Sequence, residues 1–189
     1  MSRRSRALLA GNCHVAFNSQ ECAREFSISA DRSIARKLHE TSSPIIASTT
    51  RLPSDWLHIK ITFEIRASPQ RPSIGREIRL GLMRERRLDP DFLHSYSLGS
   101  DENSWAVSLR SRDVFHLHNN NHTRLAGVHF SDADHISIVL NRQHQTASFS
   151  LNDAQQLVCF QGVDERVVPL VSISAPAVCD VAILPCEVW

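Results

Sequence analysis

The stretch Leu57-His58-Ile59-Lys60-Ile61-Thr62-Phe63-Glu64-Ile65 decides the fold class, because apolar and polar residues alternate along it without exception. Successive side chains of a β-strand point to opposite faces of a sheet. The alternation therefore predicts a strand whose odd-numbered residues, Leu57 to Ile65, face a core while the even-numbered residues face water.

The same two-residue period recurs along the chain and predicts an architecture of short strands. Residues 136–140 and 147–151 alternate in this way and flank a polar stretch suited to a hairpin loop. Residues 167–173 and 178–184 are apolar on both faces, as expected of strands in a two-sheet packing. Further alternating segments are residues 78–82, 105–109 and 115–118.

Helical periodicity is nearly absent, so a parallel sheet built from strand–helix–strand units has no support. The best helical candidate is the short stretch 30–38. A single helical turn is also expected around residues 89–93, where Asp89 caps the turn and Pro90 takes its first position. The predicted fold class is all-β, a two-sheet antiparallel sandwich.

Length and charge predict one domain without a bulk attraction to nucleic acid. The chain has 189 residues, and its 21 basic and 20 acidic side chains leave a formal net charge of +1. Residues 13–189 fit a single sandwich domain, and no apolar run approaches the ~18 residues of a membrane span. Residues 1–12 are basic and free of acids; we expect a disordered arm there, with a mitochondrial presequence as the alternative.

The cysteines indicate the redox compartment. None of the five is spaced as CxxC or as part of a zinc finger. This pattern favours a reducing compartment in which each thiol is a small apolar group, so we expect five free thiols, no zinc and a cytoplasmic location. The five are Cys13, Cys22, Cys159, Cys179 and Cys186.

Motifs for catalysis, cofactors or metals find little support. The glycines are scattered without a phosphate-binding loop, and no GxSxG motif is present. His116 and His118, with His122 nearby, form the best metal candidate, but we expect the imidazoles of His116 and His118 on the solvent face of a strand. Residues 132–135, with two Asp and one His, are interpreted as a solvated turn. We predict a protein without catalysis, cofactor or metal.

A charged loop is the best candidate for a binding site. Arg84-Glu85-Arg86-Arg87 follows a predicted strand, and guanidinium groups hold carboxylates through forked hydrogen bonds. The only tyrosine, Tyr96, follows the predicted helical turn. Because Arg and Tyr often anchor interfaces, we expect Arg84, Arg86, Arg87 and Tyr96 to border a groove for an acidic or Asn-rich peptide. A solvated loop without a partner is the alternative.

Several short motifs, taken in order, resemble the Neuralized homology repeat, a relative of the SPRY domain. Ile28-Ser29-Ala30-Asp31 is similar to the family's Leu-Ser-x-Asp, and Leu80-Gly81-Leu82 is similar to its Leu-Gly-Val-Thr. One departure is Asp153, which stands where the family has Gly after Asn. The other matching segments are residues 44–48, 63–65, 89–90, 105–107, 134–138 and 167–171.

The resemblance implies a SPRY- or concanavalin-like jelly roll that recognises targets for Neuralized-type ubiquitin ligases. The cysteines cannot form the RING of such a ligase, so the chain would serve as an adaptor or regulator, with ubiquitin-ligase components among its partners. The alternative function is carbohydrate binding by a lectin-like sandwich. A lectin needs an exposed aromatic ring, whereas Trp105 is expected in the core.

Overall fold

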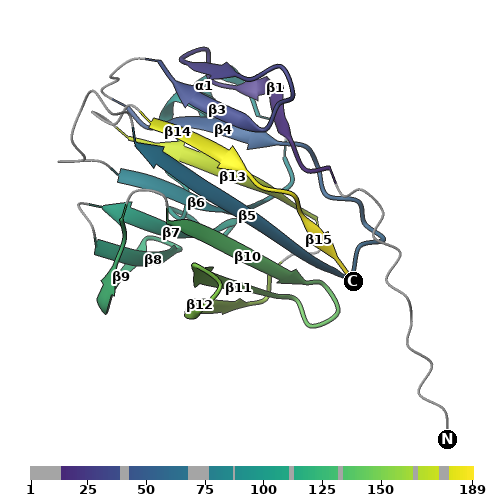
Figure 1. Ribbon diagram of the computed structural model, residues 1–189, viewed down its shortest axis with the longest axis vertical. Helices are drawn as coiled ribbons and strands as arrows, with labels where there is room; N and C mark the ends of the chain where they lie inside the picture. Colours follow the sequence, from purple (N-terminus) through teal and green to yellow (C-terminus); the bar gives the residue numbers. More distant parts are fainter. Residues whose placement is uncertain are drawn as a thin grey trace, which may run out of the picture.

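The computed structural model describes residues 14–38, 43–67, 77–86, 88–110, 113–131, 134–163, 166–174 and 179–189. These residues form two antiparallel sheets and one short helix, which confirms the predicted all-β sandwich (Figure 1). The arm expected at residues 1–12 lies outside the described residues. No helix within the described ranges is long and apolar enough to cross a bilayer.

The strands of each sheet are arranged in an order far from their order in the chain. Sheet A runs β1-β4-β13-β6-β7-β8-β9, and sheet B runs β12-β11-β10-β5-β14-β3-β2 with β15 paired to β5. Sheet A comprises β1 (Phe17–Cys22), β4 (Ile45–Thr49), β6 (Glu77–Arg84), β7 (Ser104–Arg110), β8 (Asp113–His118), β9 (Asn121–His129) and β13 (Val167–Ile173). Sheet B comprises β2 (Phe26–Ile28), β3 (Ile34–Lys37), β5 (His58–Ala67), β10 (His135–Asn141), β11 (Thr146–Leu151), β12 (Gln155–Gln161), β14 (Cys179–Ile183) and β15 (Glu187–Val188).

The strand β5 lies in the middle of sheet B and contributes one face to the core. Ile59, Ile61, Phe63 and Ile65 are buried, as their alternation predicts. The inward position expected for Leu57 is wrong: its side chain is 54% exposed. The strand begins only at His58, so Leu57 belongs to the approach to the strand and lacks the cover that the facing sheet provides.

The helical prediction for residues 30–38 is wrong, because this stretch contains the strand β3. The strand pairs with β2 on one side and with β14 on the other. Arg36 also reaches across to Asp180 with two hydrogen bonds, Nε to Oδ1 at 2.8 Å and Nη2 to Oδ2 at 2.7 Å. Pairing on both sides outweighs a weak helical preference.

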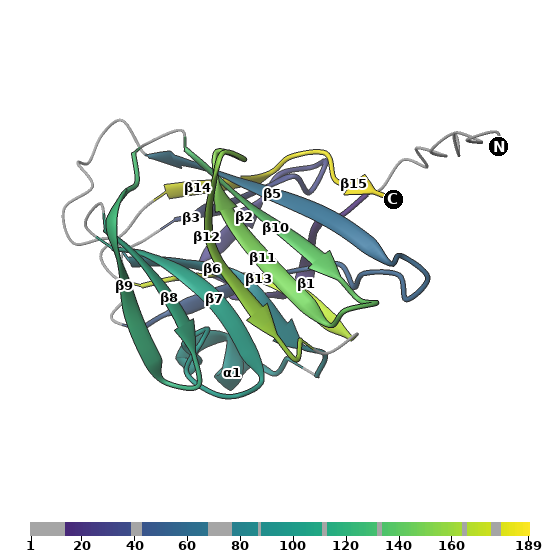
Figure 2. The ribbon, with the colours of Figure 1, turned by 90° about the horizontal axis from the view of Figure 1, so that it is seen from below.

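The expected helical turn is present as α1 (Pro90–Ser95), with Pro90 in the first turn. The Asp89 carboxylate caps it by accepting a hydrogen bond from the Phe92 backbone N–H at 2.8 Å. Figure 2 shows α1 on the outer side of sheet A, away from sheet B. The helix therefore covers the sandwich and places the following residues, 96–103, over the same side.

The cysteines depart from the expectation of five free thiols. Cys22, Cys159 and Cys179 form no disulfide. Cys186 is disulfide-bonded, so the prediction is wrong for that residue. Sequence spacing alone does not show which segments meet in space, and a disulfide depends on that proximity.

Candidate functional site

A tight hairpin turn carries the carboxylate that organises the outer face of sheet B. Residues 152–154 join β11 to β12, and Asn152 and Asp153 have positive φ angles of 51° and 58°. The Ala154 backbone N–H closes the turn by donating to the Leu151 carbonyl at 3.2 Å, and Asn and Asp tolerate the left-handed backbone at its centre better than most residues. The turn brings the Asp153 side chain over β10 and β5.

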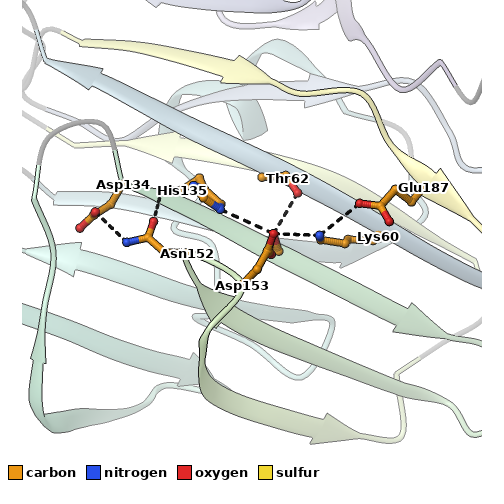
Figure 3. Close-up of polar contacts among 8 residues, drawn as sticks. Lys60, Thr62, Asp134, His135, Asn152, Asp153 and Glu187 are labelled. Carbon is orange, nitrogen blue, oxygen red and sulfur yellow. Dashed lines mark hydrogen bonds and ion pairs between the residues drawn. The ribbon is translucent and has the colours of Figure 1, made fainter.

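The Asp153 carboxylate gathers donors from two neighbouring strands (Figure 3). Lys60 Nζ of β5 donates to Oδ2 at 2.9 Å, and Ser137 Oγ of β10 donates to Oδ1 at 2.5 Å. The Thr62 hydroxyl lies 2.9 Å from that of Ser137, and His135 Nε2 lies 3.7 Å from Asp153 Oδ2. Together with Glu187, these residues are called the Asp153 network.

The electrostatics of the Asp153 network favour fixed charges. The hydrogen bond from Ser137 and the contact with Lys60 lower the pKa of the Asp153 carboxyl. The same contact with Asp153 raises the pKa of Lys60. Both pKa shifts favour the charged forms of Asp153 and Lys60 near neutral pH. The pair is therefore better suited to holding charges in position than to transferring protons.

Asn152, the first residue of the turn, fixes the second half of the segment 132–135, in which the sequence has two Asp and one His. Asn152 Nδ2 donates to Asp134 Oδ1 at 2.8 Å, and Asn152 Oδ1 accepts from the His135 backbone N–H at 3.0 Å. Asp132 lies outside the described residues. The imidazole of His135 faces Asp153 and not Asp134. Residues 134 and 135 are therefore held in place by the turn residues Asn152 and Asp153.

The sequence-predicted arginines lie at the far end of β6. Arg84 Nη1 donates to Asn103 Oδ1 at 3.1 Å. The guanidinium of Arg86 lies 4.4 Å from the centre of the Phe92 ring of α1, a cation–π contact. Both side chains are exposed, and Arg87 lies outside the described residues. The structure thus brings Arg84 and Arg86 together at one end of sheet A.

Two further arginines meet these residues from distant parts of the chain. Arg51 Nε pairs with Glu85 Oε1 at 2.9 Å, and the Glu85 backbone N–H donates to the Arg166 carbonyl at 2.9 Å. Both additional arginines are exposed. Sequence analysis missed them because no local motif links residues 51, 85 and 166. We call Arg51, Arg84, Arg86 and Arg166 the arginine surface.

Tyr96 contributes its ring and its hydroxyl in different directions. The ring stacks on Phe92 with the centroids 4.2 Å apart, beside the Arg86 guanidinium. The hydroxyl lies 2.7 Å from Asp101 Oδ1 and 2.7 Å from Ser104 Oγ. Burial is the main cause that raises the pKa of the Tyr96 hydroxyl. Tyr96 therefore holds the loop that supports the arginine surface, and only its ring borders that surface.

The candidate metal ligands lie elsewhere than expected. The His118 ring stacks on Trp105, with centroids 5.5 Å apart, and meets the edge of Phe160 of sheet B. His116 also lies next to Phe160, at 6.1 Å, so both imidazoles point toward the other sheet and the expected solvent-facing position is wrong. Burial lowers the pKa of His116. In the part of the chain that the structure describes, no group of three or more potential ligands could hold a metal ion.

Trp105 bears on the carbohydrate alternative. Its side chain is 2% exposed, so it cannot offer a ring for a sugar to stack on. The expectation that this residue belongs to the core is confirmed.

Comparisons with known proteins agree with this architecture. The family model of the SPRY domain matches residues 60–185. The SPRY domain of human HERC1 is 18% identical, with a TM-score of 0.66 over 89% of this chain and 97% of that chain. The TRIM65 PSpry domain is 12% identical, with a TM-score of 0.64 over 90% of this chain and 91% of that chain. Stonustoxin is 16% identical, with a TM-score of 0.64 over 91% of this chain and 29% of that chain. At these identities the solved structures show a shared fold.

Proposed function

Because the chain belongs to the SPRY domain family, whose members are protein-interaction modules, we propose that it binds a protein or peptide ligand through the arginine surface. The proposed role is that of an adaptor or regulator in a Neuralized-type ubiquitin ligase, without catalysis of its own. The resemblance of the motifs at residues 28–31 and 80–82 supports the Neuralized assignment, and ubiquitin-ligase components are proposed as partners.

The observation that carries the binding proposal is the presence of four exposed arginines at one end of the sandwich. They come from three separate parts of the chain: Arg84 and Arg86 flank Glu85 in the sequence, Arg51 pairs with the Glu85 carboxylate, and the Arg166 carbonyl accepts from the Glu85 backbone N–H. Contact with Phe92 restricts the Arg86 side chain before any ligand arrives. A side chain that is already oriented loses less conformational entropy on binding.

The chemistry of the arginine surface favours an acidic ligand. Guanidinium groups bind carboxylates through paired, charge-assisted hydrogen bonds. An Asn-rich peptide is the second ligand class, since side-chain amides also accept hydrogen bonds from guanidinium groups. In this proposal Arg84, Arg86 and Arg87 contact the ligand, and Tyr96 holds Phe92 and the 96–103 loop in position.

A triple variant tests the proposal directly. Arg84→Ala, Arg86→Ala and Arg87→Ala together should weaken the binding of Asp/Glu-rich peptides and the capture of partners from lysate by tenfold or more, about 1.4 kcal/mol. The loss should shrink at high salt, because exposed charges are screened. The matched control combines Arg36→Ala, Arg66→Ala and Arg124→Ala, three exposed arginines on β3, β5 and β9.

Equal losses in the two triple variants would show a general effect of charge and refute the site. Unchanged capture by the Arg84, Arg86 and Arg87 variant would place the ligand elsewhere. A glycan array tests the carbohydrate alternative. The ligase assignment is tested separately, by asking whether proteins captured by the wild-type chain include a RING ligase.

A cytoplasmic location is part of the proposal, supported by the thiols of Cys22 and Cys159, which form no disulfide. The disulfide at Cys186 is the observation against it, because disulfides rarely persist in the cytosol. Measurement of the redox state of Cys186 in intact cells tests the proposed location: a reduced Cys186 would support the cytoplasm, and a disulfide-bonded Cys186 would contradict it.

A further inference from the structure

The last strand of the structure is held on sheet B by very few contacts. After Leu184 donates its backbone N–H to Thr62, Pro185 interrupts the run of β14, because proline cannot donate to a sheet. The chain returns to β5 as β15, where Glu187 pairs with Lys60 and Val188 with Ile59. Figure 1 shows β15 beside the beginning of β5. The segment 187–189 therefore occupies its own short section of the β5 edge.

Side chains of this segment contact β5 at two points. Glu187 Oε1 accepts from Lys60 Nζ at 3.1 Å. The Trp189 ring stacks on His58 with the centroids 6.1 Å apart and the planes 8° from parallel. Residues two apart in a strand lie on the same face, so Lys60 and His58 form a two-point match for a carboxylate followed two residues later by an aromatic ring.

These contacts are of the kind that a competitor replaces easily. The Glu187 side chain is 63% exposed and Trp189 is 49% exposed. Exposed ion pairs contribute little to stability, and a two-residue strand adds few backbone hydrogen bonds. Residues 187–189 follow the disulfide-bonded Cys186, and they are the residues that the competitor replaces.

The receiving side keeps its shape when the segment leaves. Lys60 is also held by Asp153 at 2.9 Å, on the side opposite Glu187 in Figure 3. The lysine ammonium therefore stays oriented for a new carboxylate. Departure of the segment also frees backbone groups of β5, among them the His58 carbonyl that accepts from the Trp189 N–H at 3.2 Å.

We propose that residues 58–60 of β5 form a docking edge for an extended segment of a partner protein that carries an acidic residue and, two positions later, an aromatic residue, and that residues 187–189 occupy this edge until such a partner displaces them. The partner adds a strand to sheet B, which is a common mode of peptide recognition. Its carboxylate contacts Lys60 and its ring stacks on His58. This edge contains none of the residues of the arginine surface, so failure of one proposal does not refute the other.

The test uses the full chain and a fluorescein-labelled peptide with the sequence of residues 184–189 carrying Cys186→Ser. Binding is measured by fluorescence anisotropy. The chain carrying Glu187→Ala and Trp189→Ala should bind this peptide at least tenfold more tightly than the wild-type chain, because its own segment no longer competes. Adding Lys60→Ala should reduce the affinity about threefold, because an exposed ion pair is lost. Adding Arg66→Ala, a change of equal charge further along β5, should leave the affinity unchanged.

Changes in the peptide keep the test independent of folding. The peptide carrying Trp189→Ala should bind the doubly substituted chain at least fivefold more weakly than the parent peptide, and the peptide carrying Glu187→Gln about threefold more weakly. Failure of the doubly substituted chain to bind more tightly than wild type, or equal binding by all three peptides, overturns the proposal. A wild-type chain that is dimeric by light scattering through exchange of residues 187–189 also overturns it, because the occupant would then be a second copy.

Discussion

Two replacements of Asp153 separate the contribution of its side-chain contacts to stability from the cost of its left-handed backbone conformation. Asp153→Ala removes the charge-assisted hydrogen bond from buried Ser137, for which about 1.5 kcal/mol is expected, at the lower end of such bonds because the Asp153 side chain is 45% exposed. The loss of the Lys60 pair adds up to ~0.5 kcal/mol, as is usual near a surface. Asp153→Ala should thus lower the free energy of unfolding by about 2 kcal/mol at pH 7.

Asp153→Gly is the matched control for the backbone. Glycine adopts the φ of 58° without the steric cost that a Cβ carries there. It should therefore recover about 1 kcal/mol relative to Asp153→Ala, although it loses the same side-chain contacts. Urea denaturation of the three proteins, followed by tryptophan fluorescence, measures both differences.

The pH dependence gives a second, independent measurement of the same network. The folded protein lowers the pKa of the Asp153 carboxyl from its ordinary value of 3.8. Because the pKa of this carboxyl is lower in the folded protein than in the unfolded chain, its ionised form stabilises the fold fully at pH values above the unfolded pKa. This stabilisation is lost as the pH falls through the folded pKa. The difference in free energy of unfolding between wild type and Asp153→Ala should therefore be constant from pH 7 to about 5 and shrink below about pH 4. A wild type no more stable than Asp153→Ala at pH 7, or a gap that grows in acid, would refute the reasoning.

Three further predictions address the core, the sheet and the thiols. Ile61→Ala removes a fully buried side chain and should lower the free energy of unfolding by about 2–5 kcal/mol in urea, whereas an unchanged value would contradict the inward face of β5. Gly81→Ala would place a Cβ 2.1 Å from the Trp105 carbonyl oxygen, so β6 and β7 must separate; we expect a loss of ~3 kcal/mol or an insoluble protein, and a soluble variant of wild-type melting temperature would be inconsistent with this contact. During alkylation without reductant, followed by mass spectrometry, exposed Cys159 should react first and buried Cys179 only on unfolding. Burial raises the pKa of Cys22 to about 12, so about a thousandfold less of it is thiolate than of an ordinary thiol. Cys22 should therefore be alkylated slowly, and rapid alkylation would argue against its burial.

The parts of the fold that follow local rules were predictable from the sequence. Alternation identified β5, and the polar stretch after residue 140 marked the hairpin in which Asn141 pairs with Thr146. Asp89 and Pro90 predicted α1 through the chemistry of a helix start. Each of these signals arises within a few neighbouring residues.

The parts that depend on distant contacts were not predictable in this way. The stretch 30–38 becomes a strand because it pairs with β2 and with β14, which lies far along the chain. The arginine surface likewise combines three distant segments, and the donors around Asp153 come from β5 and β10. Sequence reasoning found Arg84 and Arg86 because they lie in one short charged run, and missed Arg51 and Arg166 because only the fold brings them close.

The strand order has a consequence for how this chain is made on the ribosome. The strand β13 lies between β4 and β6, and β14 lies between β3 and β5, so each sheet needs a late strand to join two early ones. A nascent chain that ends before residue 167 exposes the edges of four strands, three of which are rich in apolar residues. Such edges pair readily with other chains. We therefore expect the nascent chain to require protection by chaperones until residues 167–183 emerge, and premature termination before that point to yield aggregates.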